Sequence, residues 1–461
     1  MLRAGLEQLL LSDLPRSRRR SYLCFALALC ISLGTSQFVG PVKTAVFLDV
    51  VGPAYEPLAK SLVLLVLLPV LVAYGALVSL MRSARLLVVC VCGFYTIVFS
   101  ALTIALVLEA GRPSAWVAWV LYYAFETKTV IIMPMIWSVV ADVSTVELSK
   151  KAFPLIFFVI QVGGIVGSLA AIKVKSLGGE VGLLAIQTAT FLAVASLTWH
   201  ALRLAEEPGE FQPLLPEHGS CEVAEEANPP RDEKPRDPGW LARGLECVEG
   251  LWLLVSRPYV LMVFWASYAN LMPRTILDYQ NSVLVTQVIP ERHNQIAFLG
   301  RVNLIINSGV ALMALLGTRS IVACCGMRCC LLALPLTTLL CVLLLCVDLT
   351  LWPSVWALFV CNVIAFGLNS PCKEMLFIRT SREIKYKAKS WSEMYGNQLM
   401  KLFGAQLNLW LNRESPLCRP NCFHHATTMG IVAGWVVIWL AVVFQLGHMH
   451  TQLEFSKKII S

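Results

Sequence analysis

Long apolar runs recur along the chain and are separated by short polar segments. A helix that crosses a membrane needs about 20 predominantly apolar residues. The 461-residue sequence contains such runs at about residues 21–48, 57–81, 84–108, 114–142, 152–172, 181–204, 257–281, 294–316, 320–346, 352–371, 391–412 and 426–447. The pattern predicts an all-α polytopic membrane protein with about 12 transmembrane helices, arranged as six plus six.

The one long polar stretch, residues 205–256, separates the two sets of helices. Its proline, glutamate and arginine content is unsuited to a buried core, so we expect a polar linker, with its end from Trp240 to Ser256 compatible with an amphipathic surface helix. We therefore expect an N-terminal six-helix bundle over 1–204, a cytoplasmic linker over 205–256, and a C-terminal bundle with a short tail over 257–461. This organisation resembles that of major-facilitator-type transporters.

The composition agrees with a membrane protein. Hydrophobic residues make up 57% of the chain and charged residues 14%, whereas soluble domains are about 25% charged. A soluble enzyme, a secreted disulfide scaffold and a disordered protein are excluded. The formal net charge of +8 is better explained by loops that face anionic lipid or an anionic substrate than by a nucleic acid partner.

Lys and Arg are distributed unevenly between the two sets of loops. Of the 37 Lys and Arg residues, 25 fall on the side that carries both termini, six on the opposite side and six within helices. Because cytoplasmic loops are enriched in these residues, we expect both termini in the cytoplasm. The basic segment Met1–Arg20 is followed by a long apolar run without a clear cleavage site, which favours a retained first helix over a signal peptide.

The sequence contains no P-loop, no His-Glu-x-x-His motif and no nucleophile elbow, so we expect no enzyme, no cofactor and no metal site. Two cysteine groups leave alternatives open. The first group is at a predicted cytoplasmic loop and contains Cys324, Cys325, Cys329 and Cys330. It has no special role, carries an acyl group or binds metal adventitiously. The second group is the pair Cys418 and Cys422, for which two free thiols and a disulfide are equally compatible with the sequence.

Charged residues inside the apolar runs are the informative positions, because a charge in hydrocarbon is costly and usually faces a cavity or a partner. Arg274 and Asp278 lie one turn apart and can pair. Structural pairing or snorkelling is the simpler interpretation for Lys60, whereas Lys43 and Lys401 lie deep in helices of opposite halves. Several intramembrane cations suit an organic anion or a phosphate compound. The cations are Lys43, Lys60, Lys128, Arg274, Arg301 and Lys401.

One segment resembles a known family. Residues 373–378, Lys-Glu-Met-Leu-Phe-Ile, resemble the Lys-Glu-Met-Ala-Tyr-Ile motif of the ADP,ATP carrier (Tlc) family of plastids and intracellular bacteria. Residues 383–389 match that family's Glu-x-Lys-x-Lys-Gly-Lys with Ala at the glycine, Glu393 falls on its Asp, and Lys401 on the Lys of its Leu-Gly-Lys. The spacing holds without gaps over 373–401.

Other stretches agree more loosely, and some depart from the family pattern. Lys43 followed by Lys60 resembles the first two helices of the family, and Asp278 falls about where the family has Glu. Gly40 stands where the family has Arg, and Thr44 where it has Asp. Leu148 replaces the second acid of an Asp-Glu pair and leaves Glu147 alone, while Phe377 and Arg379 replace Tyr and Pro.

The resemblance implies nucleotide transport, with ATP:ADP antiport by alternating access, in which ATP and ADP are substrates and no oligomer is required. It implies substrate-binding roles for Lys43, Lys60, Lys373 and Lys401, and charge-balancing or coupling roles for Glu147, Asp278, Glu374 and Glu393. Two alternatives stay open. The first is a carrier of another phosphorylated or carboxylated metabolite. The second is a transport-dead membrane scaffold or receptor that acts through the 205–256 loop and the cysteine-rich turn at 324–330.

Overall fold

The structure is a computed structural model, and it describes residues 16–81, 83–109, 113–144, 146–205, 252, 254–316, 318–376, 392–411 and 425–456. These residues form helices and no strand. The first half contains α2 (Arg16–Val50), α3 (Glu56–Leu80), α4 (Ala84–Leu108), α5 (Ala115–Asp142), α6 (Val146–Ile172) and α7 (Gly179–Ala205), with short 3-10 turns η1 (Pro53–Tyr55) and η2 (Val174–Leu177). The second half contains α9 (Pro258–Tyr268), α10 (Leu271–Val288), α11 (Arg292–Leu316), α12 (Thr318–Val347), α13 (Leu351–Ile364), α14 (Ser370–Leu376), α16 (Asn397–Leu411) and α17 (His425–Ser456), with π-helical segments η3 (Ala365–Asn369) and η6 (Ser392–Gly396).

Each of the twelve predicted helices has a counterpart, but the seventh and the tenth are interrupted. Pro273 has no N–H to donate to the carbonyl of Ala269, so α9 ends there and α10 begins. Trp435 of α17 donates its indole N–H to that carbonyl at 3.0 Å, which satisfies the exposed backbone group. Pro371 likewise has no N–H for the carbonyl of Gly367, and the chain between α13 and α14 forms η3.

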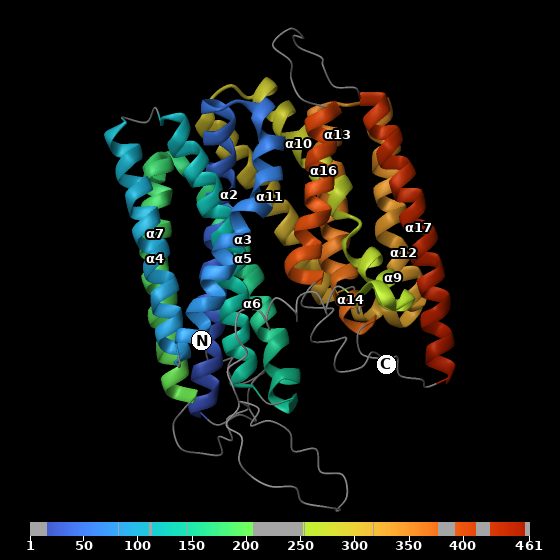
Figure 1. The fold of residues 1–461 in the computed structure, drawn as a ribbon, viewed down its shortest axis with the longest axis horizontal. Coiled ribbons are helices and arrows are strands. Elements are labelled where there is room, and N and C mark those ends of the chain that lie inside the picture. The colour runs from blue at the N-terminus through green and yellow to red at the C-terminus, as the bar shows by residue number, and fades with distance from the viewer. Residues whose placement is uncertain are drawn as a thin grey trace, which may run out of the picture.

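Two hydrophobic cores divide the molecule into halves. One core is built from residues between Tyr22 and Leu202 together with Ile296, and the other from residues between Tyr259 and Leu446. The ribbon shows the halves as two groups of helices side by side, with the start of α2 and the end of α17 at the same end of the bundle (Figure 1). We call this the terminal end and the other the opposite end.

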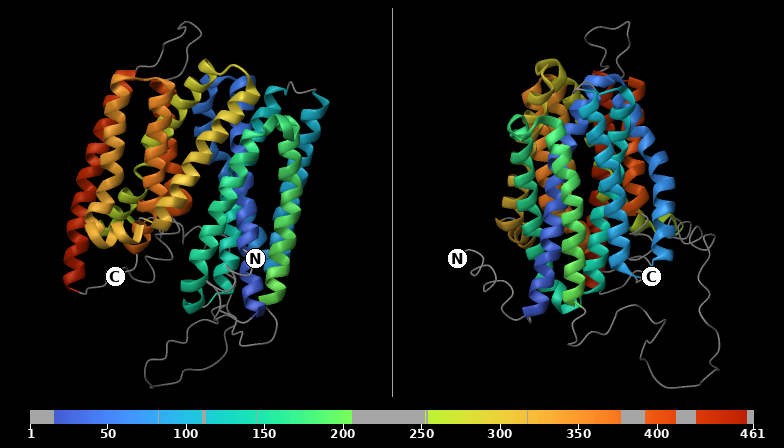
Figure 2. Two further views of the ribbon diagram at one scale, coloured as in Figure 1. Left: turned by 180° about the vertical axis from the view of Figure 1, so that it is seen from behind. Right: turned by 90° about the vertical axis from the view of Figure 1, so that its left-hand side faces the viewer.

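The halves meet through a small set of helices. α11 of the second half packs against α6 and α2, and α16 packs against α3. Seen from behind, α11 slants from the second half toward the first (Figure 2). The contact between α6 and α11 includes a hydrogen bond in which Asn307 Nδ2 donates to Ser168 Oγ at 3.2 Å. Helices of both halves therefore line the interface between the halves.

Glycines set the distance between α2 and α6. A Cβ on Gly167 would lie 1.8 Å from the carbonyl oxygen of Gly34, and a Cβ on Gly163 would lie 2.2 Å from that of Cys30. No side chain fits at these separations, so the two backbones touch. Small residues spaced four apart are the usual means of close helix packing in a membrane.

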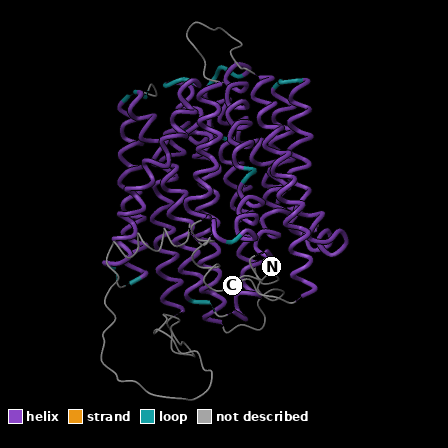
Figure 3. The backbone as a smooth tube through the Cα atoms, turned by 45° about the vertical axis from the view of Figure 1, so that its right-hand side comes forward, coloured by secondary structure: helices purple, strands orange, loops and turns teal. Residues whose placement is uncertain are grey.

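The outer surface is suited to lipid. Eight helices are long and apolar enough to cross a membrane by their length and composition, within the part of the chain that is described. Large apolar side chains point outward along them, with exposed fractions of 72% at Val72, 72% at Ile97 and 70% at Phe444. The helices run side by side and the described loops lie at the two ends (Figure 3). The chain is an integral, multi-pass membrane protein.

An ion cluster joins the halves at the opposite end of the bundle. Arg292, at the start of α11, pairs with Asp49 of α2 and, at 3.3 Å, with Glu180 of α7. His293 Nε2 lies 3.0 Å from the second oxygen of Glu180. Lys175 Nζ lies 2.6 Å from Glu291 Oε1, and its hydrogen bond lowers the pKa of the Glu291 carboxyl below its ordinary value. We call these six residues the opposite-end ion cluster.

Some predicted features lie outside the described residues. They include nearly all of the linker over 205–256, the pair Cys418 and Cys422, and residues 377–391 of the family-like segment. The first cysteine group is described and lies within the early turns of α12, where the chain breaks at Gly326 with a φ of 75°. The expected loop at these cysteines is a break of one residue, Gly326, between two helical stretches of α12.

Candidate functional site

A cavity with a volume of about 620 Å³ lies between the two halves. Small-molecule sites commonly have volumes of about 300–1,000 Å³. Its walls come from α2, α3 and α5 of the first half and from α10, α11, α13 and α16 of the second. Four of the predicted site residues line it, namely Lys43, Lys60, Asp278 and Lys401.

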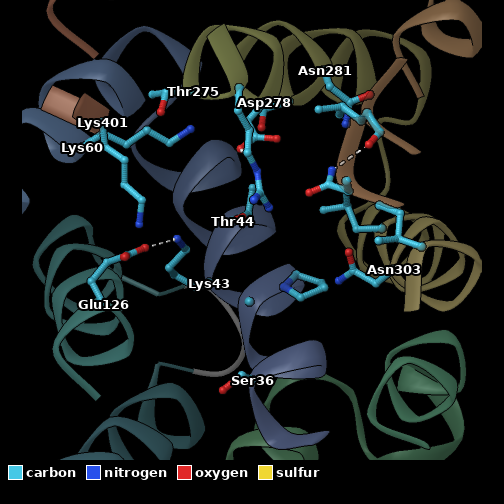
Figure 4. Close-up of a pocket in the computed structure, with 18 of the residues that line it drawn as sticks. Ser36, Lys43, Thr44, Lys60, Glu126, Thr275, Asp278, Asn281, Asn303 and Lys401 are labelled. Carbon is cyan, nitrogen blue, oxygen red and sulfur yellow. Dashed lines mark hydrogen bonds and ion pairs between the residues drawn. The ribbon is translucent and has the colours of Figure 1, made fainter. Parts of the chain in front are cut away.

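Lys43 is buried in the cavity wall and is already neutralised. Its Nζ lies 2.8 Å from Glu126 Oε1, and it also sits 4.1 Å above the ring of Tyr122. Lys43 comes from α2 and Glu126 from α5, so the ion pair ties two helices of the same half together (Figure 4). The Glu126 carboxylate also acts electrostatically on Lys401 and Lys60.

Two further cations of the cavity are paired along their own helices. Lys60 Nζ lies 3.1 Å from Glu56 Oε1, one turn earlier on α3. Arg274 Nε lies 3.8 Å from Asp278 Oδ2, one turn later on α10, which confirms that these two residues pair. Each cation therefore carries a carboxylate that offsets its charge.

Lys401 on α16 is different. It lines the cavity, and it forms no ion pair or hydrogen bond with the residues that the structure describes. Among the described lining residues there are four cations and three carboxylates, and Lys401 is the cation left over. Because a cation in a partly buried site attracts an anion more strongly than it would in water, this position favours a negatively charged ligand.

The rest of the wall is neutral and polar. Figure 4 shows Lys43, Lys60 and Lys401 gathered with Glu126 on one side, while Asn281 and Asn303 lie on the other. Seven amide side chains of the described residues line the cavity, six of them from the second half; they are Gln37, Asn281, Asn303, Asn307, Asn362, Asn397 and Gln398. Such groups both donate and accept hydrogen bonds, so the cavity has a cationic side and a hydrogen-bonding side.

The other predicted site residues do not join this set. Lys373 lies on α14, where its Nζ is 3.4 Å from the hydroxyl of Tyr268, and it does not line the cavity. The side chains of Glu147, Glu374 and Glu393 lie outside the described part of the structure. Their roles stay predictions.

Two carboxylates of the cavity escaped the sequence-based site. Glu126 and Glu56 lie within or beside apolar runs of the sequence. The sequence does not reveal that Glu126 pairs with Lys43, which is 83 residues earlier and on another helix. Gly40 and Thr44, the two departures from the family pattern in the first helix, also line the cavity. The chain therefore differs from that pattern in the walls of the cavity itself.

Within the described residues, no group of three or more His, Cys, Asp or Glu side chains is placed to hold a metal ion. The charged and amide side chains of the cavity offer electrostatic and hydrogen-bonding recognition.

No protein-family model matches the sequence, and no curated protein sequence matches it. Solved structures do match the fold. The D323A mutant of the nucleoside transporter NupG is similar with a TM-score of 0.57 and 14% identity, over 93% of this chain and 99% of that one. The POT family transporter PepTSo matches with a TM-score of 0.58 and 12% identity, over 95% and 99%.

A bacterial homologue of the iron transporter ferroportin, in its inward-facing state, matches with a TM-score of 0.56 and 13% identity, over 94% of this chain and 100% of that one. At such low identity the matches describe the fold alone. They cover nearly the whole of each chain, and all three structures are of membrane transporters. The chain therefore has a major-facilitator-like fold of two helical halves around a central cavity.

Proposed function

We propose that the protein transports an anionic metabolite by alternating access, that the substrates are nucleotides, and that ATP is exchanged for ADP. The fold and the central cavity support transport. The lysines that line the cavity, together with the family-like segment over 373–401, support nucleotides. Lysine ammonium groups suit phosphate oxygens, and the amide side of the cavity suits a base or a sugar.

The observation that carries the proposal is Lys401. It is the cation in excess among the described lining residues, and it comes from the half opposite to Lys43 and Lys60. An anion bound at Lys401 lies within reach of both halves. A ligand shifts a conformational equilibrium only when it binds one state better than the other, and contacts to both halves supply such a difference.

The carboxylates have a role in the same scheme. When substrate is absent, Glu126 and Glu56 keep Lys43 and Lys60 neutralised in the cavity. A phosphate group competes with these carboxylates for the lysines, so binding exchanges internal ion pairs for pairs with the substrate. Asp278 likewise neutralises Arg274 in the second half.

The orientation in the membrane belongs to the proposal as well. The excess of Lys and Arg at the terminal end supports a cytoplasmic position for both termini. The opposite-end ion cluster then closes the cavity toward the other side of the membrane, and it opens when the halves rock.

The experiment is uptake of radiolabelled ATP into proteoliposomes that contain the full-length protein, with Lys401→Gln compared with wild type. We expect Lys401→Gln to lose at least about tenfold in uptake, because a charge-assisted contact is worth about 1.5–3 kcal/mol. Lys173→Gln is the matched control, because Lys173 is an exposed lysine outside the cavity. Full uptake by correctly inserted Lys401→Gln would contradict the proposal.

A second candidate keeps the mechanism and changes the ligand. Gly40 and Thr44 line the cavity where the nucleotide-transporting family has Arg and Asp, so the walls differ where a substrate would touch them. This observation favours another phosphorylated or carboxylated anion. Competition of unlabelled nucleotides, sugar phosphates and dicarboxylates against the labelled substrate separates the two candidates, because the true substrate class competes at the lowest concentration.

A further inference from the structure

Lys128 is a buried lysine that takes no part in the cavity described above. It lies on α5 two residues after Glu126, and two residues rotate a helix by about 200°, so the two side chains leave opposite faces. Glu126 faces the cavity, whereas Lys128 points between α2 and α7 and is 2% exposed. No carboxylate lies within ion-pair distance of its Nζ among the described residues.

Three neutral oxygens surround this ammonium group. Nζ donates to Thr35 Oγ1 at 3.3 Å, to Ser36 Oγ at 3.1 Å and to Gln187 Oε1 at 2.9 Å. The rings of Phe125 and Phe191 lie 5.6 and 5.9 Å from the same atom, within cation–π range. An ammonium group has three N–H donors, and here each has an acceptor.

The neighbours are arranged as acceptors only. The hydroxyls of Thr35 and Ser36 both donate to the carbonyl of Ser32, at 3.1 and 2.9 Å, so neither has a hydrogen left for Lys128. The amide nitrogen of Gln187 is directed to Thr190, which leaves its oxygen toward Lys128. The three oxygens match the three N–H donors of a charged lysine.

Lys128 lies behind the wall of the cavity. Ser36, one of the three acceptors, lines the cavity and is labelled in Figure 4. Its Oγ lies 3.1 Å from Lys128 Nζ, so one side chain separates the ammonium from the cavity. No described carboxylate neutralises this charge, and the surrounding helices screen it far less than water does. The field of Lys128 adds to that of Lys401 and raises the positive potential in the cavity.

We propose that Lys128 is a positioning residue that sets the charge preference of the cavity: a fixed buried cation that, through Ser36, selects multiply charged anions over singly charged ones. This inference rests on the proposed transport of an anion and narrows the class of substrate. Lys128 itself touches no substrate. Its effect grows with the negative charge of the ligand, because electrostatic attraction is proportional to that charge.

Equilibrium binding to the purified full-length protein tests the inference. The probes are AMP, ADP and ATP, together with orthophosphate, pyrophosphate and tripolyphosphate, which carry charge without a nucleoside. We expect Lys128→Met to weaken binding by a factor that rises by about three- to tenfold with each added negative charge. Lys128→Arg, which keeps the charge, should restore the wild-type preference.

A second variant removes the charge without removing the side chain. Gln187→Glu places a carboxylate where the amide oxygen now accepts from Lys128, so it neutralises the cation with little change in shape. It should reproduce the charge-dependent loss even where Lys128→Met does not fold. A merely structural role of Lys128 would instead weaken all six probes equally and lower the melting temperature.

The outcomes separate the inference from the proposed function. If wild type binds the probes while Lys128→Met or Gln187→Glu keeps the wild-type ratios between them, the inference is wrong and anion transport stands. If wild type binds the inorganic phosphates but no nucleotide, nucleotide transport is wrong and the inference is still decided by the inorganic series. Binding of none of the six probes by folded wild type overturns both.

Discussion

Single charges decide what the central cavity can hold. Three of the four described cations in its lining have a carboxylate within 4 Å, and Lys401 has none. The paired cations limit the cost of keeping charge inside a membrane protein, and the unpaired one provides the attraction for a ligand. A cavity in which every cation were paired would have no reason to favour an anion.

The pair between Lys43 and Glu126 should be strongly coupled. Removing either partner leaves the other charge poorly compensated, so Lys43→Gln and Glu126→Gln should each lower the melting temperature of the ligand-free protein. The double variant should lose less free energy of unfolding than the two single variants together, with a coupling energy of about 1–3 kcal/mol. Thermal unfolding in detergent measures this cycle, and strictly additive losses would show that the pair is not a unit.

Sequence reasoning located part of this site. A charge inside an apolar run is visible without a structure, and Lys43, Lys60, Asp278 and Lys401 do line one cavity. Pairing across helices is not visible, since it depends on which faces meet. Glu126 was therefore missed as the partner of Lys43, and Lys373 was expected at the cavity but lies on α14 beside Tyr268.

At the scale of helices, the cavity is shaped by close helix packing and by two interruptions in the helices of the second half. The backbones of α2 and α6 touch at Gly34, Gly163 and Gly167, and this contact fixes the helix that presents Lys43. The breaks at Ala269 and at η3 lie in helices that line the cavity from the second half. Irregular backbone at membrane depth is tolerated where protein or a cavity surrounds it.

A side chain at Gly167 should force α2 and α6 apart. Because its Cβ would lie 1.8 Å from a backbone oxygen, Gly167→Val cannot be accommodated by a side-chain rotation. We expect the free energy of unfolding to fall by about 1–3 kcal/mol or more. We also expect the variant not to elute as a single monodisperse peak in size-exclusion chromatography. Gly434→Val is the matched control, since a Cβ there meets nothing within 4 Å. Normal elution and melting of Gly167→Val would contradict the packing described here.

The apolar pattern was a reliable guide to the helices and a poor guide to their interruptions. Long apolar runs bounded by polar residues have few alternatives to a membrane helix, which is why all twelve were found. The breaks precede Pro273 and Pro371, which the hydropathy pattern does not distinguish from other apolar residues. The carbonyl freed at Ala269 is satisfied by the indole of Trp435 from another helix, which no local pattern reveals. The π-helical segments η3 and η6 have no signal in the period of apolar residues.

At the scale of the whole molecule, two halves are held together at the opposite end by charge. Arg292 and His293 of α11 reach Asp49 and Glu180 of the first half, and Lys175 reaches Glu291. Partly exposed ion pairs contribute little individually, so a cluster of them suits the contact that breaks in each cycle of the transport proposed above.

Arg292→Gln should favour the state that is open at the opposite end. Loss of the pairs to Asp49 and Glu180 should shift the equilibrium by about 1–2 kcal/mol, a factor of about 5–30. A cysteine at Thr44, which lines the cavity, reports this shift through faster reaction with a membrane-impermeant thiol reagent added on that side. Glu109→Gln is the control, because Glu109 bonds Ser114 within one half. If the cysteine reacts at the same rate in Arg292→Gln and Glu109→Gln, the ion cluster does not control opening of the cavity.

The most direct measurement is labelled ATP uptake into proteoliposomes of the wild-type protein, with and without ADP inside. Exchange through a cavity that must hold an anion before the halves can rock predicts saturable uptake that internal ADP stimulates several-fold, and loss of this uptake in Lys401→Gln but not in Lys173→Gln. Correctly inserted protein that takes up no ATP under either condition would contradict nucleotide exchange.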